Sequence, residues 1–111
     1  MFMDKLPYTI NDLRKAIQQK RIFWTEHSDE KMLEREIRKQ EVRECIINGE
    51  VIEEYDDDTP FPSCLVFGKT INGRNLHACC SYCNGAIYII TAYEPNLFKW
   101  NDDFKTRRSS D

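Results

Sequence analysis

The chain has 111 residues, of which 32% are charged and 41% hydrophobic, and a net charge of −3. This length fits one domain rather than two, and the composition is typical of a globular protein rather than a disordered one. No apolar run approaches the roughly 20 residues that span a bilayer, so we expect no membrane partner. We expect a single domain over residues 1–111, with an ordered core from about residue 9 to 104 and a flexible tail over residues 106–111.

The first half of the chain carries three helical patterns. Thr9 and Asp12 have the spacing of a capping box, in which a hydroxyl and a carboxylate bond the first free N–H groups of a helix. Leu13 and Ile17 follow at a helical spacing, which favours one buried face. Gly49 is expected to end the third helix in a left-handed conformation. The predicted helices span residues 10 to about 20, residues 26 or 27 to 34, and about residues 39 to 48.

The second half is dominated by strand patterns separated by turns. The predicted strands span residues 22–25, 51–55, 64–70, 76–82 and 86–93. The pairs Asn72-Gly73 and Asn84-Gly85 separate the last three strands. Asn-Gly is the preferred pair for a two-residue hairpin turn, because both residues tolerate positive φ. The sequence therefore predicts an α+β fold, with N-terminal helices packed on one face of an antiparallel meander.

Two-residue turns also imply a register. They would place Phe67 opposite Ala78, and His77 opposite Ala92. A slip of one residue would reverse every assignment of side chains to faces. On this register the face towards the helices carries Leu65, Phe67, Leu76, Ala78, Cys80, Tyr82, Ile87 and Ile89. The other face carries Val66, Gly68, His77, Cys79, Ser81, Tyr88, Ile90 and Ala92.

The five cysteines suggest packing rather than metal binding. Cys80 and Cys83 form one C-x-x-C pair, whereas a structural zinc site usually draws four ligands from two such pairs. Cys79 and Cys80 point to opposite faces of a strand, so they do not bind one metal together. We expect no metal and no cofactor. Since no secretory signal precedes them, we expect reduced thiols and a cytoplasmic protein.

Two histidines and one arginine are the main candidates for chemistry. His27 lies at the start of the second helix, and His77 lies in the middle of a strand on the mixed face. An imidazole can take or give a proton near neutral pH, although a lone histidine is more often bonded to backbone. Arg35, eight residues after His27, is positioned to bind a phosphate in bidentate fashion, or else to pair with a neighbouring glutamate at the helix end.

Two charged segments suggest binding surfaces. Near the C-terminus, aromatic residues alternate with bases, a composition that suits stacking on nucleobases and binding of phosphates. We expect Trp100, Lys105 and Arg107 to contact such a substrate, although packing of the aromatic residues on the domain is the competing interpretation. The run from Glu50 to Asp58 holds six acids and no base, and could instead receive a basic protein segment.

The chain resembles domain-of-unknown-function family 4258 over roughly residues 10 to 108. The resemblance lies in Trp24-Thr25-Glu26-His27, Met32 to Ile37, Asn48 to Tyr55, Pro60 to Gly68, Leu76-His77, Ile89 to Pro95, and Trp100 with Asp103-Phe104. That family is similar to the RelE/BrnT-like toxins of toxin–antitoxin systems, which pack helices on one side of an antiparallel sheet and cleave RNA. The resemblance implies functional roles for His27, Arg35, His77 and Tyr93.

Two hypotheses follow. The first is a metal-independent endoribonuclease that acts on mRNA, with the two histidines in proton transfer, Arg35 on the phosphate and Tyr93 in stacking or hydrogen bonding. Its partners would be RNA and a cognate antitoxin protein. The alternative is a non-catalytic module that binds a protein or RNA, for which the acidic run is the motivation.

Overall fold

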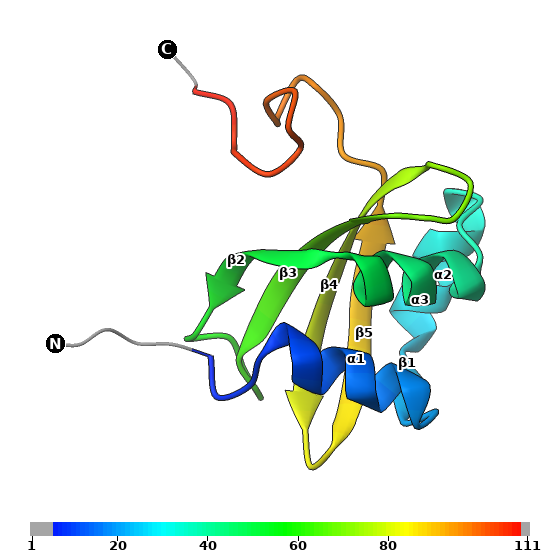
Figure 1. The fold of residues 1–111 in the computed structure, drawn as a ribbon, viewed down its shortest axis with the longest axis vertical. Coiled ribbons are helices and arrows are strands. Elements are labelled where there is room, and N and C mark those ends of the chain that lie inside the picture. Colours follow the sequence, from blue (N-terminus) through cyan, green and yellow to red (C-terminus); the bar gives the residue numbers. More distant parts are fainter. Residues whose placement is uncertain (1–5, 110–111) are drawn as a thin grey trace, which may run out of the picture.

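The computed structural model describes residues 6–109, which form three helices and one five-stranded sheet (Figure 1). The strand order is β1-β5-β4-β3-β2. In chain order the elements are α1 (Ile10–Gln18), β1 (Ile22–Trp24), α2 (Glu26–Glu34), α3 (Lys39–Asn48), β2 (Glu50–Tyr55), β3 (Ser63–Lys69), β4 (Asn75–Cys83) and β5 (Ala86–Tyr93).

The α+β class and the meander are confirmed. Strands β2 to β5 pair in antiparallel fashion with their neighbours along the chain. β1 adds to the outer edge of β5 as a parallel strand, so the sheet is mixed. The helices α1 and α3 lie across one face of this sheet in Figure 1. No helix within residues 6–109 is long and apolar enough to cross a membrane.

The helix starts follow the local chemistry of the sequence. Thr9 and Asp12 form the predicted capping box at α1, and Thr25 and Ser28 form a second one at α2. The expectation for Gly49 was wrong, because its φ of −104° is not left-handed. A glycine is required there because an added Cβ would lie 2.4 Å from the Cys45 carbonyl oxygen. Gly49 therefore allows a close approach of backbones rather than a turn.

Only one of the two Asn-Gly pairs forms a two-residue turn. Cys83 pairs with Ala86, and Asn84 and Gly85 between them have φ values of 52° and 80°. The other pair lies in a five-residue loop over residues 70–74, because Lys69 pairs with Asn75. The longer loop shifts the register between β3 and β4 by one residue. A β-bulge near Ile90 shifts the register between β4 and β5 in turn, so that Cys79 pairs with Thr91 while Cys80 pairs with Ile89.

These two shifts correct the predicted faces. Phe67 lies opposite His77 instead of Ala78, and His77 lies opposite Tyr93 instead of Ala92. As a result Leu65 and Phe67 belong to the face away from the helices. The core against the helices contains Val42, Cys45 and Ile46 from α3, with Cys64, Val66, Leu76, Ala78, Cys80, Ile87, Ile89 and Ala92 from the sheet.

The other face of the sheet is partly covered by the segment that follows β5, residues 94–109, called here the C-terminal segment or C-terminal cover. Trp100 is only 2% exposed, and the backbone of residues 106 and 108 takes part in hydrogen bonds. Asn101 donates to the Thr106 carbonyl at 2.8 Å, and Arg108 donates to the Lys99 carbonyl at 2.8 Å. Residues 110 and 111 of the expected tail lie outside the described residues.

Candidate functional site

An open hollow of about 590 Å³ lies at the end of β5. It forms where β1 stops: Trp24 pairs with Ile89, and among residues 6–109 no strand continues beside β5 after that point. Helix α2 and the C-terminal segment border the space instead. The lining residues are His27 and Arg35 from α2, Ile90, Thr91 and Tyr93 from β5, and Glu94, Asn96, Lys99, Trp100 and Arg107 from the segment after it.

Helix α2 and its C-cap contribute two of the four residues that the sequence singled out. His27 lies in its first turn, directly after the Thr25 cap, and is exposed to solvent. Arg35 is the C-terminal cap residue of the helix. The Arg35 guanidinium donates to the Thr91 hydroxyl at 3.1 Å and to the Ala92 carbonyl at 2.8 Å. Arg35 thus provides hydrogen bonds to part of the β5 edge that has no neighbouring strand beyond β1.

Tyr93 lies between the hollow and the buried His77. The Tyr93 hydroxyl is 3.2 Å from His77 Nδ1, and His77 Nε2 is 2.7 Å from the Phe104 carbonyl oxygen. A carbonyl oxygen only accepts hydrogen bonds, so Nε2 carries the proton in this arrangement. In the neutral ring Nδ1 is then an acceptor, and the Tyr93 hydroxyl donates to it.

His77 does not reach the hollow, although both histidines were expected to border one open site. Its side chain is completely buried, with the Trp100 ring edge-on at 4.5 Å and the Phe67 ring at 5.8 Å. Burial lowers the pKa of His77 below its ordinary value, against an opposing effect of the bond to Phe104. Burial likewise raises the pKa of Tyr93. The pair therefore holds a neutral imidazole and a neutral phenol at neutral pH.

The predicted substrate-binding residues have partners within the chain. Arg107 lies over the Trp100 ring at 4.7 Å and makes a two-pronged bond to Glu53, with distances of 2.7 and 3.0 Å. Lys105 pairs with Glu50 at 2.9 Å and does not line the hollow. Arg107 and the buried Trp100 do line it. The acidic strand β2 thus binds the protein's own C-terminal bases.

The hollow keeps an excess of positive charge. Glu94 is paired with Arg74 at 3.1 Å, and Arg107 is paired with Glu53. Within residues 6–109, Arg35 and Lys99 have no carboxylate within ion-pair distance. Two cations beside an exposed imidazole and a phenol suit an anionic ligand such as a phosphodiester.

Three of the five cysteines, Cys45, Cys64 and Cys80, are buried packing residues, whereas Cys79 and Cys83 are half-buried. Cys64 and Cys80 lie in the core with their sulfur atoms 3.9 Å apart, and Cys45 packs beneath β3 and β4. Burial raises the pKa of the Cys45 thiol to about 12 and that of Cys79 to about 11. Within the part of the chain that the structure describes, no group of three or more His, Cys, Asp or Glu is arranged to hold a metal ion.

A family model matches residues 24–94, which contain α2, α3 and strands β2 to β5. The chain belongs to the family described as Domain of unknown function (DUF4258). The match includes His27, Arg35, His77 and Tyr93, and ends where the C-terminal segment begins. The DUF4258 region therefore supplies two sides of the hollow, and the segment beyond it supplies the third. No curated protein and no solved structure matches the chain.

Sequence reasoning missed several residues of the hollow. Lys99 provides a cation, and Asn96 accepts hydrogen bonds from the backbone of Phe98 and Lys99 and so shapes the turn. Thr91 faces the hollow only because of the bulge near Ile90. Thr91 lies within the segment that resembles the family but has no catalytic side chain, and Asn96 and Lys99 belong to no motif, so only the folded structure brings the three to the hollow.

Proposed function

We propose that this hollow binds single-stranded RNA and that the protein is a metal-independent endoribonuclease acting on mRNA. The observation that supports the proposal best is that three chemically suitable side chains line the same hollow. His27 and Arg35 from the two ends of α2 and Tyr93 from the end of β5 line one open, positively charged space. The resemblance to RelE/BrnT-like toxins agrees with this chemistry.

The proposed reaction is a transesterification within the RNA. The 2′-oxygen attacks the adjacent phosphorus, the bond from phosphorus to the 5′-oxygen breaks, and a 2′,3′-cyclic phosphate and a 5′-hydroxyl form. His27 takes the proton of the 2′-hydroxyl, and solvent water in the open hollow gives a proton to the 5′-oxygen. Arg35 and Lys99 stabilise the negative charge that grows on the phosphate oxygens.

In this scheme His77 is a positioning residue rather than a proton-transfer group. Transfer of a proton to its ring would create a buried cation, which the lowered pKa of His77 disfavours. The ring instead fixes the Tyr93 hydroxyl, whose oxygen retains a lone pair for a hydrogen bond from the substrate. This assignment replaces the expectation of two catalytic histidines with one.

An aromatic surface beside the hollow favours RNA over a simple phosphate. Phe23 and Tyr88 stack with ring centroids 5.1 Å apart, and Phe23 is 54% exposed. Tyr88 precedes Ile90 of the hollow by two residues on β5, and Phe23 precedes His27 by four. Exposed aromatic rings next to cations are typical of surfaces that stack unpaired bases. A nucleotide adjacent to the bound phosphate would reach this surface.

The test is incubation of the purified protein with a defined mRNA, with and without ribosomes, and mapping of the cut sites. We expect His27→Ala and Arg35→Ala each to lower the cleavage rate by about 100-fold, the usual contribution of one proton-transfer or charge-stabilising group. Arg21→Ala is the matched control, because Arg21 is exposed near Gly85, at the far end of β5.

Two results would contradict the proposal. Identical band patterns for wild type, His27→Ala and Arg35→Ala would remove the catalytic assignment. Loss of activity on addition of a chelator, followed by recovery with a divalent cation, would contradict metal independence. His77→Ala is a less direct variant, because it also disturbs the cover formed by Trp100 and Phe104.

A second candidate function is a non-catalytic module that binds a basic protein segment. Its support is an open acidic hollow of about 800 Å³, lined in part by Glu54, Asp57 and Asp58. Glu50 and Glu53 from the same acidic run are already paired within the chain, which weakens this candidate. A pull-down that recovers one stoichiometric partner, lost in an Asp57→Asn/Asp58→Asn variant, together with absence of nuclease activity, would favour it.

A further inference from the structure

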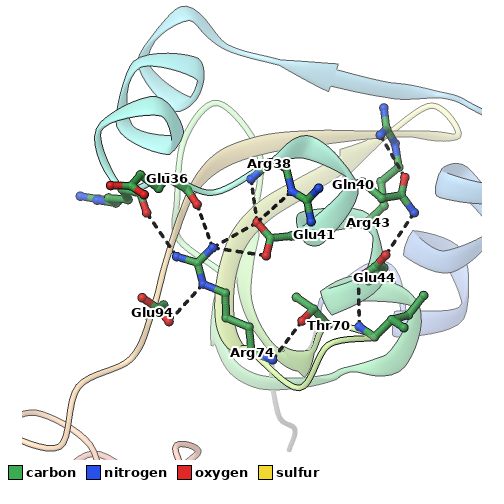
Figure 2. Close-up of polar contacts among 11 residues, drawn as sticks. Glu36, Arg38, Gln40, Glu41, Arg43, Glu44, Thr70, Arg74 and Glu94 are labelled. Atoms are coloured by element: carbon green, nitrogen blue, oxygen red, sulfur yellow. Dashed lines mark hydrogen bonds and ion pairs between the residues drawn. The ribbon is translucent and has the colours of Figure 1, made fainter.

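The guanidinium of Arg74 joins three segments that are far apart in the sequence. Arg74 belongs to the loop between β3 and β4, and Figure 2 shows its side chain extending between Glu36, Glu41 and Glu94. Its Nη1 donates to the Glu36 carbonyl at 2.8 Å, and its Nη2 donates to the Arg35 carbonyl at 3.2 Å. Its Nε lies 3.1 Å from a carboxylate oxygen of Glu94.

Glu41 holds this guanidinium in place. Its two carboxylate oxygens lie 3.1 and 3.3 Å from Arg74 Nη1, and the side chain is almost completely buried. Burial alone would raise the pKa of Glu41, but the backbone N–H of Arg38 and the Arg74 guanidinium outweigh it and lower the pKa. Glu41 is therefore ionised at neutral pH and orients the planar Arg74 side chain.

Helix α2 needs such a contact because little apolar packing secures it. The only side chains of α2 that are buried are Ser28 and Met32, and Leu33 is 82% exposed. The turn after the helix contains Glu36 with a φ of 56°, a conformation that residues other than glycine rarely adopt. The carbonyl groups that Arg74 binds belong to this helix end and to this turn, so Arg74 stabilises both.

We propose that Arg74 is the positioning residue of the hollow. It fixes the end of α2, which carries Arg35, against the end of β5, where Glu94 follows Tyr93. Arg35 then reaches Thr91 and Ala92 in the one orientation that leaves its remaining N–H groups available to the phosphate. This inference rests on the proposed function for its phosphate, whereas the positioning itself is measurable without RNA.

The experiment compares Arg74→Lys with Arg38→Lys. Both replacements keep a positive charge near Glu41, but only the first removes a fork that reaches two backbone carbonyls and Glu94. Arg38 is exposed and lies 3.8 Å from Glu41, and its backbone bond to Glu41 survives the replacement. It is therefore the matched control. Glu94→Gln, which weakens only one of the contacts, serves as the second variant if Arg74→Lys does not fold.

The first readout is hydrogen exchange at the backbone amides of Arg35, Glu36 and Ile37, which donate to carbonyls of α2. We expect exchange about tenfold faster in Arg74→Lys, as for the loss of one or two charge-assisted hydrogen bonds, and no change in Arg38→Lys. Unchanged exchange at these amides in Arg74→Lys would overturn the inference, whether or not the protein binds RNA.

The second readout is RNA cleavage in a double-mutant cycle with Arg35→Ala. If Arg74 acts through Arg35, Arg74→Lys lowers kcat/KM about tenfold in the wild-type background and causes no further loss in Arg35→Ala. An equal loss in both backgrounds would show a general effect on structure and overturn the positioning role. A wild-type protein without any cleavage would refute the proposed function, and the exchange readout alone would then decide the role of Arg74.

Discussion

The two faces of the sheet are built on different physical principles, and two adjacent residues of β4 show the contrast. Leu76 and His77 are both completely buried, but they point to opposite faces. Leu76 packs in the apolar core beneath the helices. His77 lies beneath the C-terminal segment, with both ring nitrogens in hydrogen bonds and aromatic rings around it.

The two faces therefore have different roles: one stabilises the fold, and the other determines where particular residues lie. Apolar packing is nearly independent of direction, so any residues with the right period and volume create a core. The cover on the other face depends on individual bonds, such as those of His77 to Tyr93 and Phe104, each of which requires one geometry. We therefore expect the helix face to supply most of the unfolding free energy, and the other face to determine where Tyr93 and the C-terminal segment lie.

Leu76→Ala should produce the largest effect. Removal of a fully buried leucine side chain leaves a cavity between α3 and β4, and such replacements typically lower the free energy of unfolding by about 2–5 kcal/mol. Urea denaturation followed by circular dichroism would measure the change. Leu33→Ala on the exposed side of α2 is the control, and we expect it to change stability by less than about 0.5 kcal/mol. Equal effects of the two replacements would refute the assigned core.

His77→Leu should have a smaller and more local effect. The replacement leaves the Phe104 carbonyl and the Tyr93 hydroxyl without their partner, which costs about 1–3 kcal/mol for buried groups. Hydrogen exchange would locate the loss. We expect faster exchange at the amides of Asn101 and Arg108 in the C-terminal segment, and little change at Ala78 in the core. Uniform acceleration at all three amides would mean that the two faces unfold together.

The same contrast explains which parts of the fold could be predicted from the sequence. The Thr9 cap, the buried stripe of α1 and the Asn84-Gly85 turn are local patterns, and the structure confirms them. The Asn72-Gly73 prediction was wrong because Thr70 and Arg74 bond each other through backbone and hydroxyl groups, and so extend the loop to five residues. The bulge near Ile90 has no local signature either.

The candidate site could be predicted only in part for the same reason. His27, Arg35 and Tyr93 were expected from residue chemistry and from the resemblance to a family, and the structure brings them to one hollow. The burial of His77 depends on Trp100 and Phe104, more than 20 residues along the chain, and could not be derived from alternation along a strand. No local pattern predicts that Lys99 lines the hollow or that Arg74 bonds the end of α2.

Acid should weaken the C-terminal cover before it weakens the core. Burial lowers the pKa of His77 in the folded protein from an ordinary value of 6.5. As the pH falls below about 6.5, the unfolded chain therefore gains a proton that the folded chain does not, and the stability contributed by the neutral ring is lost. The carboxylates of Glu41 and Glu53, whose pKa values are also lowered, respond only below about 4.5.

Unfolding free energies of wild type and His77→Leu, measured from pH 7.5 to 5, would isolate this contribution, because the other groups titrate in both proteins. We expect the wild type to lose more stability than the variant over this range. If the free energies of the two proteins changed in parallel with pH, the His77 ring would not be held neutral, and the C-terminal segment would not shield it from solvent.

The ion pair between Arg107 and Glu53 should have the smallest effect, although it links the C-terminal segment directly to β2. The bond is two-pronged, and the Arg107 guanidinium lowers the pKa of Glu53, but the Arg107 side chain is 58% exposed. Water and salt screen such pairs, so we expect Glu53→Gln to cost at most about 1 kcal/mol, with less effect at high salt. Glu50→Gln, which breaks the more exposed pair with Lys105, is the matched control.

A double-mutant cycle of Glu53→Gln and Arg107→Gln in low and high salt would measure the coupling energy directly. The comparison of the two faces requires this coupling to be smaller than the loss in His77→Leu, because the buried ring has hydrogen bonds that solvent cannot replace, whereas each partner of the ion pair can be solvated. A larger coupling would mean that surface charge holds the C-terminal segment.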